Sequence, residues 1–267
     1  MNYLSTGNFF GQNDRTMSVD GITITETKYD YEFVDWHYHE NPHFTFITQG
    51  NLRQGTHRGT YECSADTLLF HNSQEPHYNI KPKGITRGFQ IEVALPWYKK
   101  FEVDLNKLPP IANITQPDAR LVFYNIYKEA RMSDAMATLT VDSLLLETFA
   151  CMLGKETFAT GTPRWVRRAD EILRETCDRP FSLQELSKEL NVHWAHLSRE
   201  FRRYFRCNFS EYVRKIKVGK SLALLRNTNL SIAEITFACG FADQSHFNRC
   251  FKEFTGITPK AFRRVAR

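Results

Sequence analysis

The feature that most constrains this chain is a helical unit that occurs twice in its carboxy-terminal part. Ser182-Leu-Gln-Glu185 and Ser231-Ile-Ala-Glu234 both carry the pattern Ser-x-x-Glu. The serine hydroxyl of this pattern accepts a backbone N–H three residues later and the glutamate reaches back, so each segment predicts the start of a helix. Further matches follow at an offset of 50 residues: Leu197 with Phe247, Arg199 with Arg249, and Phe201 with Phe251.

Each repeat predicts two helices around a short turn. The first has helices at Leu183–Leu190 and at about 194–205, and the second has them at Ile232–Ala238 and at about 243–254. The longer helix of each pair has one apolar and one polar face. This arrangement is typical of the helix-turn-helix motif, whose second helix enters the DNA major groove. Between the repeats, Glu211–Asn227 predicts one long connecting helix.

The polar faces of the two longer helices carry side chains that can read base edges. Arginine pairs with guanine, and asparagine or glutamine pairs with adenine. The predicted DNA-binding residues are Ala195, Ser198, Arg199, Arg202, Gln244, Ser245, Asn248, Arg249 and Lys252. The residues expected at phosphates are Arg202, Arg203, Lys215, Lys217 and Lys220.

The charge of the chain divides in the same place. Residues 1–162 carry 14 Lys/Arg and 19 Asp/Glu, a net charge of −5. Residues 163–267 carry 21 Lys/Arg and 11 Asp/Glu, a net charge of +10. A basic half beside an acidic one indicates that the basic half meets a polyanion. The alternative is a solvated basic face on an unrelated helical bundle.

Three stretches are predicted along the chain: a β-rich domain at 1–105, a helical segment at 106–158, and a helical DNA-binding domain at 159–267. Thr157–Pro163 has the composition of a linker between the last two. The helical segment serves either as core or as a dimerisation face. Apolar runs between turn residues predict strands at Gly21–Tyr29, His43–Thr48, Thr67–His71 and Gly88–Val93.

Residues 181–264 resemble the AraC/XylS family of bacterial transcription regulators. The most specific block runs from Gly240-Phe241 through Arg249 and Gly256 to Phe262-Arg263, with the pattern G-F-x-D-x-S-x-F-x-R-x-F-K-x-x-x-G-x-x-P-x-x-[YF]-R. The resemblance implies a multidomain α and β fold, in which a cupin-like β-barrel sensor domain with flanking helices precedes an all-α domain with two helix-turn-helix units. It also implies double-stranded DNA and a small-molecule effector as partners, with RNA polymerase and a second copy of the chain as further candidates.

Two positions depart from the family pattern. Arg206 stands where the first recognition helix usually ends in glycine, and a left-handed helix end is costlier for arginine. His193 stands where a serine or threonine commonly caps that helix.

Six of the nine histidines lie between positions 37 and 77. His37 and His39 are two residues apart, so a strand presents both on one face, and His43 and His77 follow. Cupin metal enzymes carry H-x-H-x3-E-x6-G and a later histidine, and here His43 replaces the glutamate. Three interpretations stay open: a divalent metal site at His37, His39, His43 and His77; an effector pocket of His37, His39, His43, Phe46, His77 and Arg87; or histidines with neither role.

The sequence predicts a ligand-responsive, sequence-specific transcriptional regulator and not an enzyme. The rival hypothesis is a metal-dependent cupin enzyme that carries a DNA-binding tail. The chain has no apolar run long enough for a membrane span, and its six cysteines form no C-x-x-C pair, as expected of reduced thiols in a cytoplasmic protein.

Overall fold

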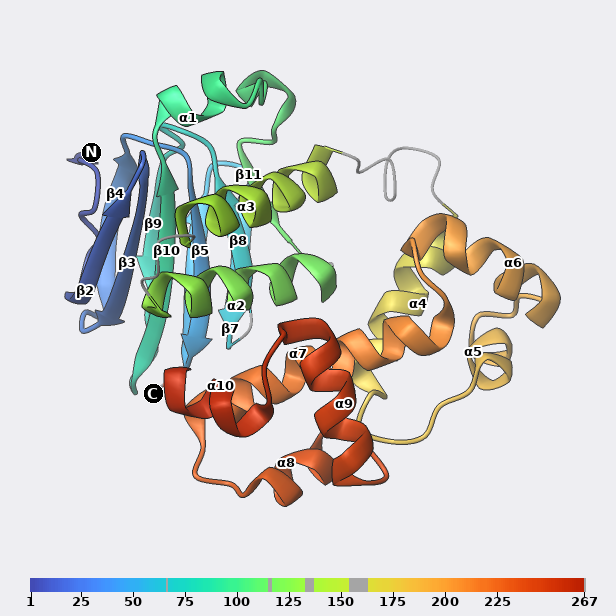
Figure 1. Cartoon of the computed structure of the whole chain (residues 1–267). Helices are drawn as coiled ribbons and strands as arrows, with labels where there is room; N and C mark the ends of the chain where they lie inside the picture. Colours follow the sequence, from blue (N-terminus) through green and yellow to red (C-terminus); the bar gives the residue numbers. More distant parts are fainter. Residues whose placement is uncertain (66, 115–116, 133–136, 154–162, 267) are drawn as a thin grey trace. The chain divides into compact units, whose positions relative to one another are not determined.

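The structure is a computed structural model that describes residues 1–65, 67–114, 117–132, 137–153 and 163–266. The chain divides into two compact units, 1–152 and 153–267, which are described separately. Figure 1 shows that the first unit holds the strands and that the second unit is helical. The linker predicted at 157–163 lies outside the described residues except for Pro163.

The amino-terminal unit is built on two β-sheets that face each other (Figure 1). The five-stranded sheet has the order β1-β4-β9-β6-β7, and the six-stranded sheet has the order β11-β8-β5-β10-β3-β2. The strands are β1 (Asn2–Leu4), β2 (Gln12–Val19), β3 (Ile22–Tyr29), β4 (Phe33–His39), β5 (His43–Gln49), β6 (Asn51–Thr56), β7 (Gly59–Ser64), β8 (Leu68–His71), β9 (His77–Ile80), β10 (Thr86–Val93) and β11 (Ile111–Asn113).

Helices cover the outer face of the six-stranded sheet. They are α1 (Leu95–Lys100), α2 (Pro117–Met132) and α3 (Ala137–Leu153), with a short 3-10 turn, η1 (Leu105–Lys107). Phe44 on β5 packs against Phe123 of α2 and Phe149 of α3, with ring centroids 4.8 and 5.3 Å apart. Each such buried ring contributes about 1.5–3 kcal/mol to the hydrophobic free energy of folding. Thus α2 and α3 form part of the core of the β-rich unit.

The carboxy-terminal unit consists of seven helices within its described residues, 163–266. They are α4 (Arg164–Glu175), α5 (Leu183–Glu189), α6 (Trp194–Phe205), α7 (Phe209–Asn227), α8 (Ile232–Ala238), α9 (Gln244–Thr255) and α10 (Pro259–Ala266). The two predicted capping boxes are confirmed. Ser182 Oγ accepts from the Glu185 backbone N–H at 3.1 Å, and Ser231 Oγ accepts from that of Glu234 at the same distance.

The two helix-turn-helix units are not identical in length. The first helices, α5 and α8, are 49 residues apart in the sequence, whereas the second helices, α6 and α9, are 50 apart. The additional residue therefore lies in the second turn. His193 caps α6 through Nδ1, which accepts from the Ala195 backbone N–H at 3.3 Å. Asp243 caps α9 with a shorter bond of 2.8 Å from the His246 backbone N–H.

Gly240 in the second turn is required by two features of the backbone. Its φ of 73° lies in the left-handed region. A Cβ atom at this position would lie 2.6 Å from the carbonyl oxygen of Cys177 and the carbonyl carbon of Asp178. The second turn therefore packs directly on the backbone that follows α4.

Helix α7 holds both helix-turn-helix units in one packed structure. It contacts α4, α6, α8, α9 and α10. Tyr212 on α7 donates its hydroxyl to Asp170 Oδ1 on α4 at 2.7 Å. Near the middle of α7, Lys217 Nζ donates to the Gly240 carbonyl oxygen at 2.5 Å. The separation of α6 and α9 is therefore set by one continuous helix.

The fold class predicted from the sequence is confirmed: a β-rich unit with flanking helices, followed by an all-α unit with two helix-turn-helix pairs. The cysteines that the structure reports on, Cys63, Cys177, Cys207, Cys239 and Cys250, are all free and buried. Within the described ranges, none of the helices combines the length and the apolar content that a bilayer crossing requires.

Replacement of Arg206 by glycine should stabilise the carboxy-terminal unit. Arg206 ends α6 with φ of 58°, and Gly256 ends α9 with φ of 75°. An L-residue in this region costs roughly 1–2 kcal/mol, partly offset by the greater freedom of glycine in the unfolded chain, so a net gain of about 0.5–1 kcal/mol is expected. Hydrogen exchange of the α6 and α7 amides in the full chain measures it.

Gly256→Ala is the matched control for this substitution and should speed the exchange of the α9 amides, because alanine is strained at positive φ. Unchanged or faster exchange of the α6 amides in Arg206→Gly would contradict the strain argument.

A fragment of residues 161–267 should fold without the rest of the chain. Its core is its own: Val166, Leu186, Leu197 and Phe201 are buried in one cluster of the carboxy-terminal unit. Dispersed amide resonances and a cooperative thermal transition are the expected results. A fragment with the spectrum of an unfolded chain would refute the domain limit at residue 159.

Candidate functional site

The polar faces of α6 and α9 form the first candidate site, here called the reading faces. Their nine residues are those predicted to contact DNA. All are exposed except Asn248, which is half-buried: Ala195, Ser198, Arg199 and Arg202 on α6, and Gln244, Ser245, Asn248, Arg249 and Lys252 on α9. These side chains are therefore available to a partner of this unit.

The opposite face of each reading helix fixes its position. Leu197 and Phe201 of α6 and Phe247 and Phe251 of α9 are at most 1% exposed. Arg199, by contrast, has a side chain that is 75% exposed, and its Nε lies 3.6 Å from Glu200 Oε1. An ion pair this exposed contributes little to stability, so the guanidinium can leave it for a stronger partner.

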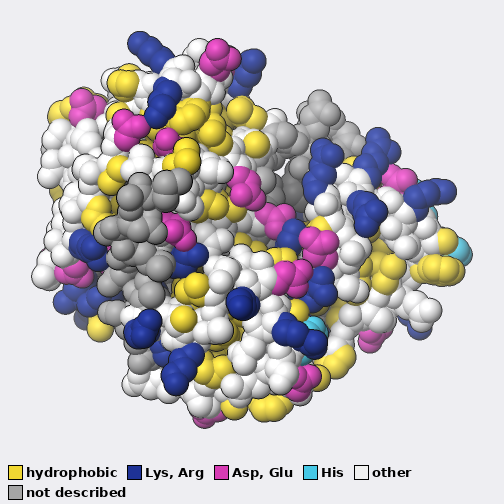
Figure 2. Space-filling view, in the orientation of Figure 1, with side chains coloured by type: hydrophobic (Ala, Val, Ile, Leu, Met, Phe, Trp, Pro, Cys, Tyr) yellow, Lys and Arg dark blue, Asp and Glu magenta, His cyan; other side chains and the backbone are white. Residues whose placement is uncertain are grey.

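All three lysines expected at phosphates have partners within the protein. Lys217 donates to the Gly240 carbonyl oxygen, and its pKa is lowered because its side chain is partly buried. Lys217 therefore has a structural contact in this unit, and its predicted contact with a phosphate stays a prediction. Lys215 pairs with Glu211 at 3.1 Å, and Lys220 lies 3.8 Å from Asp178. Arg202 and Arg203 are exposed, and Figure 2 shows Lys and Arg side chains at the surface over this part of the unit.

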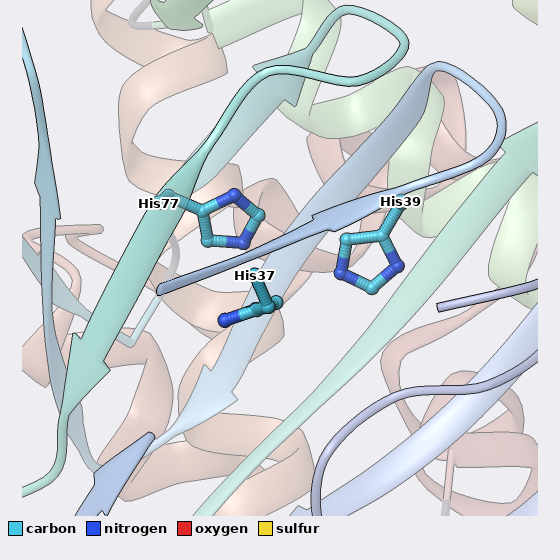
Figure 3. Close-up of side chains that lie close together, drawn as sticks. All are labelled: His37, His39 and His77. Atoms are coloured by element: carbon cyan, nitrogen blue, oxygen red, sulfur yellow. The ribbon is translucent and has the colours of Figure 1, made fainter. Parts of the chain in front are cut away.

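The second candidate site is a pocket between the two sheets of the amino-terminal unit, here called the histidine pocket. His37 and His39 come from β4 and His77 from the neighbouring β9, all in the five-stranded sheet. Figure 3 shows the three rings gathered in one place. His43 on β5 and His71 on β8 come from the opposite sheet. All five side chains are at most 3% exposed.

The five rings form a continuous cluster. The ring centroids of His37 and His77 are 4.2 Å apart, and those of His39 and His43 are 4.4 Å apart. His43 stacks on His71 at 4.4 Å. The three histidines His37, His39 and His77 can bring one ring nitrogen each within 4.8 Å of one another, and so can His43, His71 and His77.

Two predicted pocket residues lie elsewhere. Phe46 is on the opposite face of β5 from His43, because strand side chains alternate, and it packs edge-on against Tyr124 of α2 with centroids 4.8 Å apart. Arg87 is exposed and lies 3.7 Å from Asp14 on β2. The effector-pocket set predicted from the sequence was therefore wrong at these two positions.

His71 and several residues of the pocket wall were not predicted from the sequence. Only the pairing of β8 with β5, in which His71 lies opposite His43, brings His71 into the cluster. The further lining residues are Phe9, Phe10, Tyr29, Tyr31, Thr45, Leu52, Gln54, Asn79 and Gln90. The alternation of polar and apolar residues along β10 is a signal that could have indicated Gln90, and no comparable pattern marks Gln54.

Burial keeps the histidines of the pocket neutral. It lowers the pKa of His43 to about 3 and holds the pKa of His39, His71 and His77 well below the usual value. The pKa of His37 is lowered for the same reason. Neutral imidazole offers one ring nitrogen with a free lone pair, which is the form that accepts hydrogen bonds and binds metal ions.

The amino-terminal segment covers one side of the pocket. Phe9 stacks on His39 at 4.6 Å, and Phe10 meets His37 edge-on at 4.9 Å. The backbone N–H of Gly7 donates to Glu92, a buried carboxyl whose pKa burial raises to about 7. The rings of this segment limit access of water to the histidines.

Comparison with known proteins gives matches over the carboxy-terminal unit. Residues 186–265 match a family model described as a helix-turn-helix domain. The HTH-type transcriptional regulator GbdR of Pseudomonas aeruginosa is 31% identical over 106 residues. Those residues are 40% of this chain and 29% of GbdR, so the chain spans less than a third of that relative. The Msm operon regulatory protein of Streptococcus mutans is 23% identical over 99% of this chain and 98% of its own length.

Solved structures give the same two kinds of match. The carboxy-terminal domain of the response regulator yesN from Fusobacterium nucleatum is 32% identical over 36% of this chain and 95% of that chain, with a TM-score of 0.35. ToxT of Vibrio cholerae is 15% identical over 92% of this chain and 99% of that chain, with a TM-score of 0.39. The motif of residues 240–263, the duplicated capped units and the family match at 186–265 together identify the carboxy-terminal unit as a double helix-turn-helix domain of the AraC/XylS type.

Proposed function

We propose that the protein is a sequence-specific DNA-binding transcriptional regulator. One observation carries this proposal: two capped helix-turn-helix units, joined by a single helix, each expose a reading face on their second helix. Such a unit matches the requirement for reading two segments of major groove on one duplex. The net charge of +10 on residues 163–267 supplies the attraction to phosphate.

The two reading faces would select different bases. On α9, Arg249 pairs with guanine, and Gln244 and Asn248 pair with adenine by their fork of donor and acceptor. On α6, Arg199 is the residue suited to guanine, and Ala195 gives an apolar contact for a thymine methyl group. Arg202, Arg203 and Lys252 would contact phosphates and so set the register of the protein on DNA.

The histidine pocket is proposed as the sensor site of this regulator. It is lined by neutral imidazoles and by the amides of Gln54 and Asn79, groups that accept or donate directional bonds. A ligand that binds more tightly to the DNA-binding state of the chain than to its other state would raise the affinity for DNA. DNA would then raise the affinity for the ligand by the same factor. Dimerisation and contact with RNA polymerase stay predictions.

Arg199→Ala and Arg249→Ala should each weaken binding to the selected DNA site by about 1–3 kcal/mol, the usual discrimination of a bidentate arginine–guanine pair. The site is first isolated by selection of fragmented genomic DNA on the full-length protein. Fluorescence anisotropy then compares that site with a shuffled duplex of equal length.

Arg53→Ala is the control for these variants, because it removes the same charge from an exposed arginine of the other unit that pairs with Glu62. It should leave both affinities unchanged. Equal losses on the selected and shuffled duplexes in Arg199→Ala or Arg249→Ala would mean that these residues contact phosphate and not bases.

Binding to DNA should weaken steeply with salt. Each phosphate that the protein neutralises adds roughly 0.9 to the negative slope of log K against log salt concentration. Titrations of the selected duplex at several KCl concentrations give the slope for the wild type. The slope of Arg202→Ala should be shallower by about 1, and a salt-independent affinity would contradict the basic-surface argument.

A further inference from the structure

We propose that His37, His39 and His77 bind one divalent transition-metal ion of borderline softness, such as Zn²⁺ or Co²⁺. The proposal names the chemical class of ligand for the histidine pocket and in that respect rests on the proposed function. Metal binding itself requires only the amino-terminal unit, so it can be tested without DNA.

The three side chains converge because of strand geometry. His37 and His39 are two residues apart on β4 and therefore point to the same face of the sheet. His77 is the direct cross-strand partner of His37 in the antiparallel pair of β4 with β9. One ring nitrogen of each residue lies within 4.8 Å of the others. Small rotations of the rings would bring these nitrogens to one ion, since Zn–N distances are about 2.0–2.1 Å.

Backbone carbonyls fix the orientation of two of these rings. His37 Nδ1 lies 2.8 Å from the Asp35 carbonyl oxygen, and His77 Nδ1 lies 3.1 Å from the Glu75 carbonyl oxygen. A carbonyl only accepts, so Nδ1 must carry the proton in both residues and Nε2 keeps its lone pair. Histidines that bind metal ions in proteins commonly donate their other ring N–H in this way.

His39 supplies an independent sign of a ligand site. Its side chain is 3% exposed, and among the described residues no hydrogen-bond partner reaches its Nδ1. A buried polar atom without a partner costs about 1–3 kcal/mol, which a bound ligand would offset. The His39 ring packs against the rings of Phe9, His43 and His77, with centroids 4.6, 4.4 and 5.6 Å away.

The donor set selects the class of ion. The pocket is lined by imidazole, amide, hydroxyl and aromatic groups, with no carboxylate among the lining residues that the structure describes. Imidazole nitrogens suit Zn²⁺, Co²⁺, Ni²⁺, Cu²⁺ and Fe²⁺, whereas Ca²⁺ and Mg²⁺ prefer oxygen ligands. The cavity has a volume of about 20 Å³, which suits one ion or one or two waters rather than a drug-sized molecule.

The second set of three histidines is less prepared to bind an ion. His43, His71 and His77 also gather their nitrogens within 4.8 Å. Nδ1 of His43 and of His71 also has no hydrogen-bond partner among the described residues, so this feature does not separate the two sets. The difference is that the side-chain amide of Gln54 contacts Nε2 of His71, so this nitrogen already has a partner. Since His77 belongs to both sets, the structure favours the set on the five-stranded sheet.

Titration of the metal-free full-length chain with Co²⁺ tests the proposal. One equivalent should bind and give visible ligand-field absorption, and Zn²⁺ should displace it. X-ray absorption at the zinc edge of the wild-type complex should then show nitrogen neighbours at about 2.0 Å with imidazole scattering. Absence of saturable binding at one equivalent, or sulfur neighbours from cysteine, would overturn the site.

Substitutions assign the ligands. His37→Gln and His77→Gln should weaken Co²⁺ binding by more than about 100-fold, the upper range for loss of a mere supporting residue. His57→Gln is the matched control, because His57 is an exposed histidine that stacks on Trp36 outside the pocket. His71→Gln should bind Co²⁺ as the wild type does. Loss of binding in His71→Gln with retention in His37→Gln would overturn the assignment. If a variant fails to fold, the more conservative His37→Asn and His71→Asn are compared in the same titration.

The two proposals fail independently in these measurements. A chain that selects a DNA site but takes up no Co²⁺ would refute the metal site and leave the regulator standing. A chain that binds one Co²⁺ but retains no DNA sequence would refute the regulator and leave the metal site standing. Anisotropy of the selected duplex with and without one equivalent of Zn²⁺ completes the comparison.

Discussion

In both units the position of the candidate site depends on the burial of aromatic rings on one face of a strand or helix. This burial determines which side chains lie on the opposite face. In the amino-terminal unit Phe44 and Phe46 of β5 pack against α2 and α3. Alternation then turns His43 inward between the sheets. In the carboxy-terminal unit the buried Phe201 and Phe247 turn the reading faces outward. Neither candidate site can be moved without repacking a core.

Helix α7 gives the carboxy-terminal unit its fixed geometry. Lys217, one of the lysines on this helix, shows that a basic side chain can stabilise the fold of a basic domain. Lys217 satisfies the Gly240 carbonyl oxygen and lies over the Phe241 ring, with its Nζ 5.6 Å from the ring centroid. The turn that positions α9 is therefore fixed by contacts with the connecting helix α7. The number of basic residues therefore overstates the positive charge available to bind a polyanion, since some of these side chains interact with other groups of the domain.

The four helices of the two repeats and the helix that connects them could be predicted to within about two residues, because their signals are local. The capping boxes at Ser182 and Ser231 mark helix starts, and the period of the phenylalanines marks the buried faces. The strands found from the sequence, such as β5 and β10, are buried on both faces and read as apolar runs. The exposed β2 and the alternating β6 carry no such run and were not identified.

The sites show the same limit. His37 and His39 were found because two positions on one strand suffice to predict a shared face. His71 was missed, since its place depends on which strand pairs with β8, and pairing is a long-range property. The error at Arg87 has a different origin: β10 pairs with β3 in unbroken register, so alternation places Arg87 on the face opposite to Gln90, which lines the pocket.

The unequal spacing of the two repeats, 49 residues between the first helices and 50 between the second, has a consequence for the proposed target. The two readers follow each other head to tail along one chain, end in different residues, Arg206 and Gly256, and carry different side chains on α6 and α9. If the same duplex were bound in the opposite orientation, the reading face of α6 would meet the bases that suit α9, and the reading face of α9 would meet those that suit α6. A single chain would thus bind an asymmetric DNA site in one orientation, and this site would not be a palindrome.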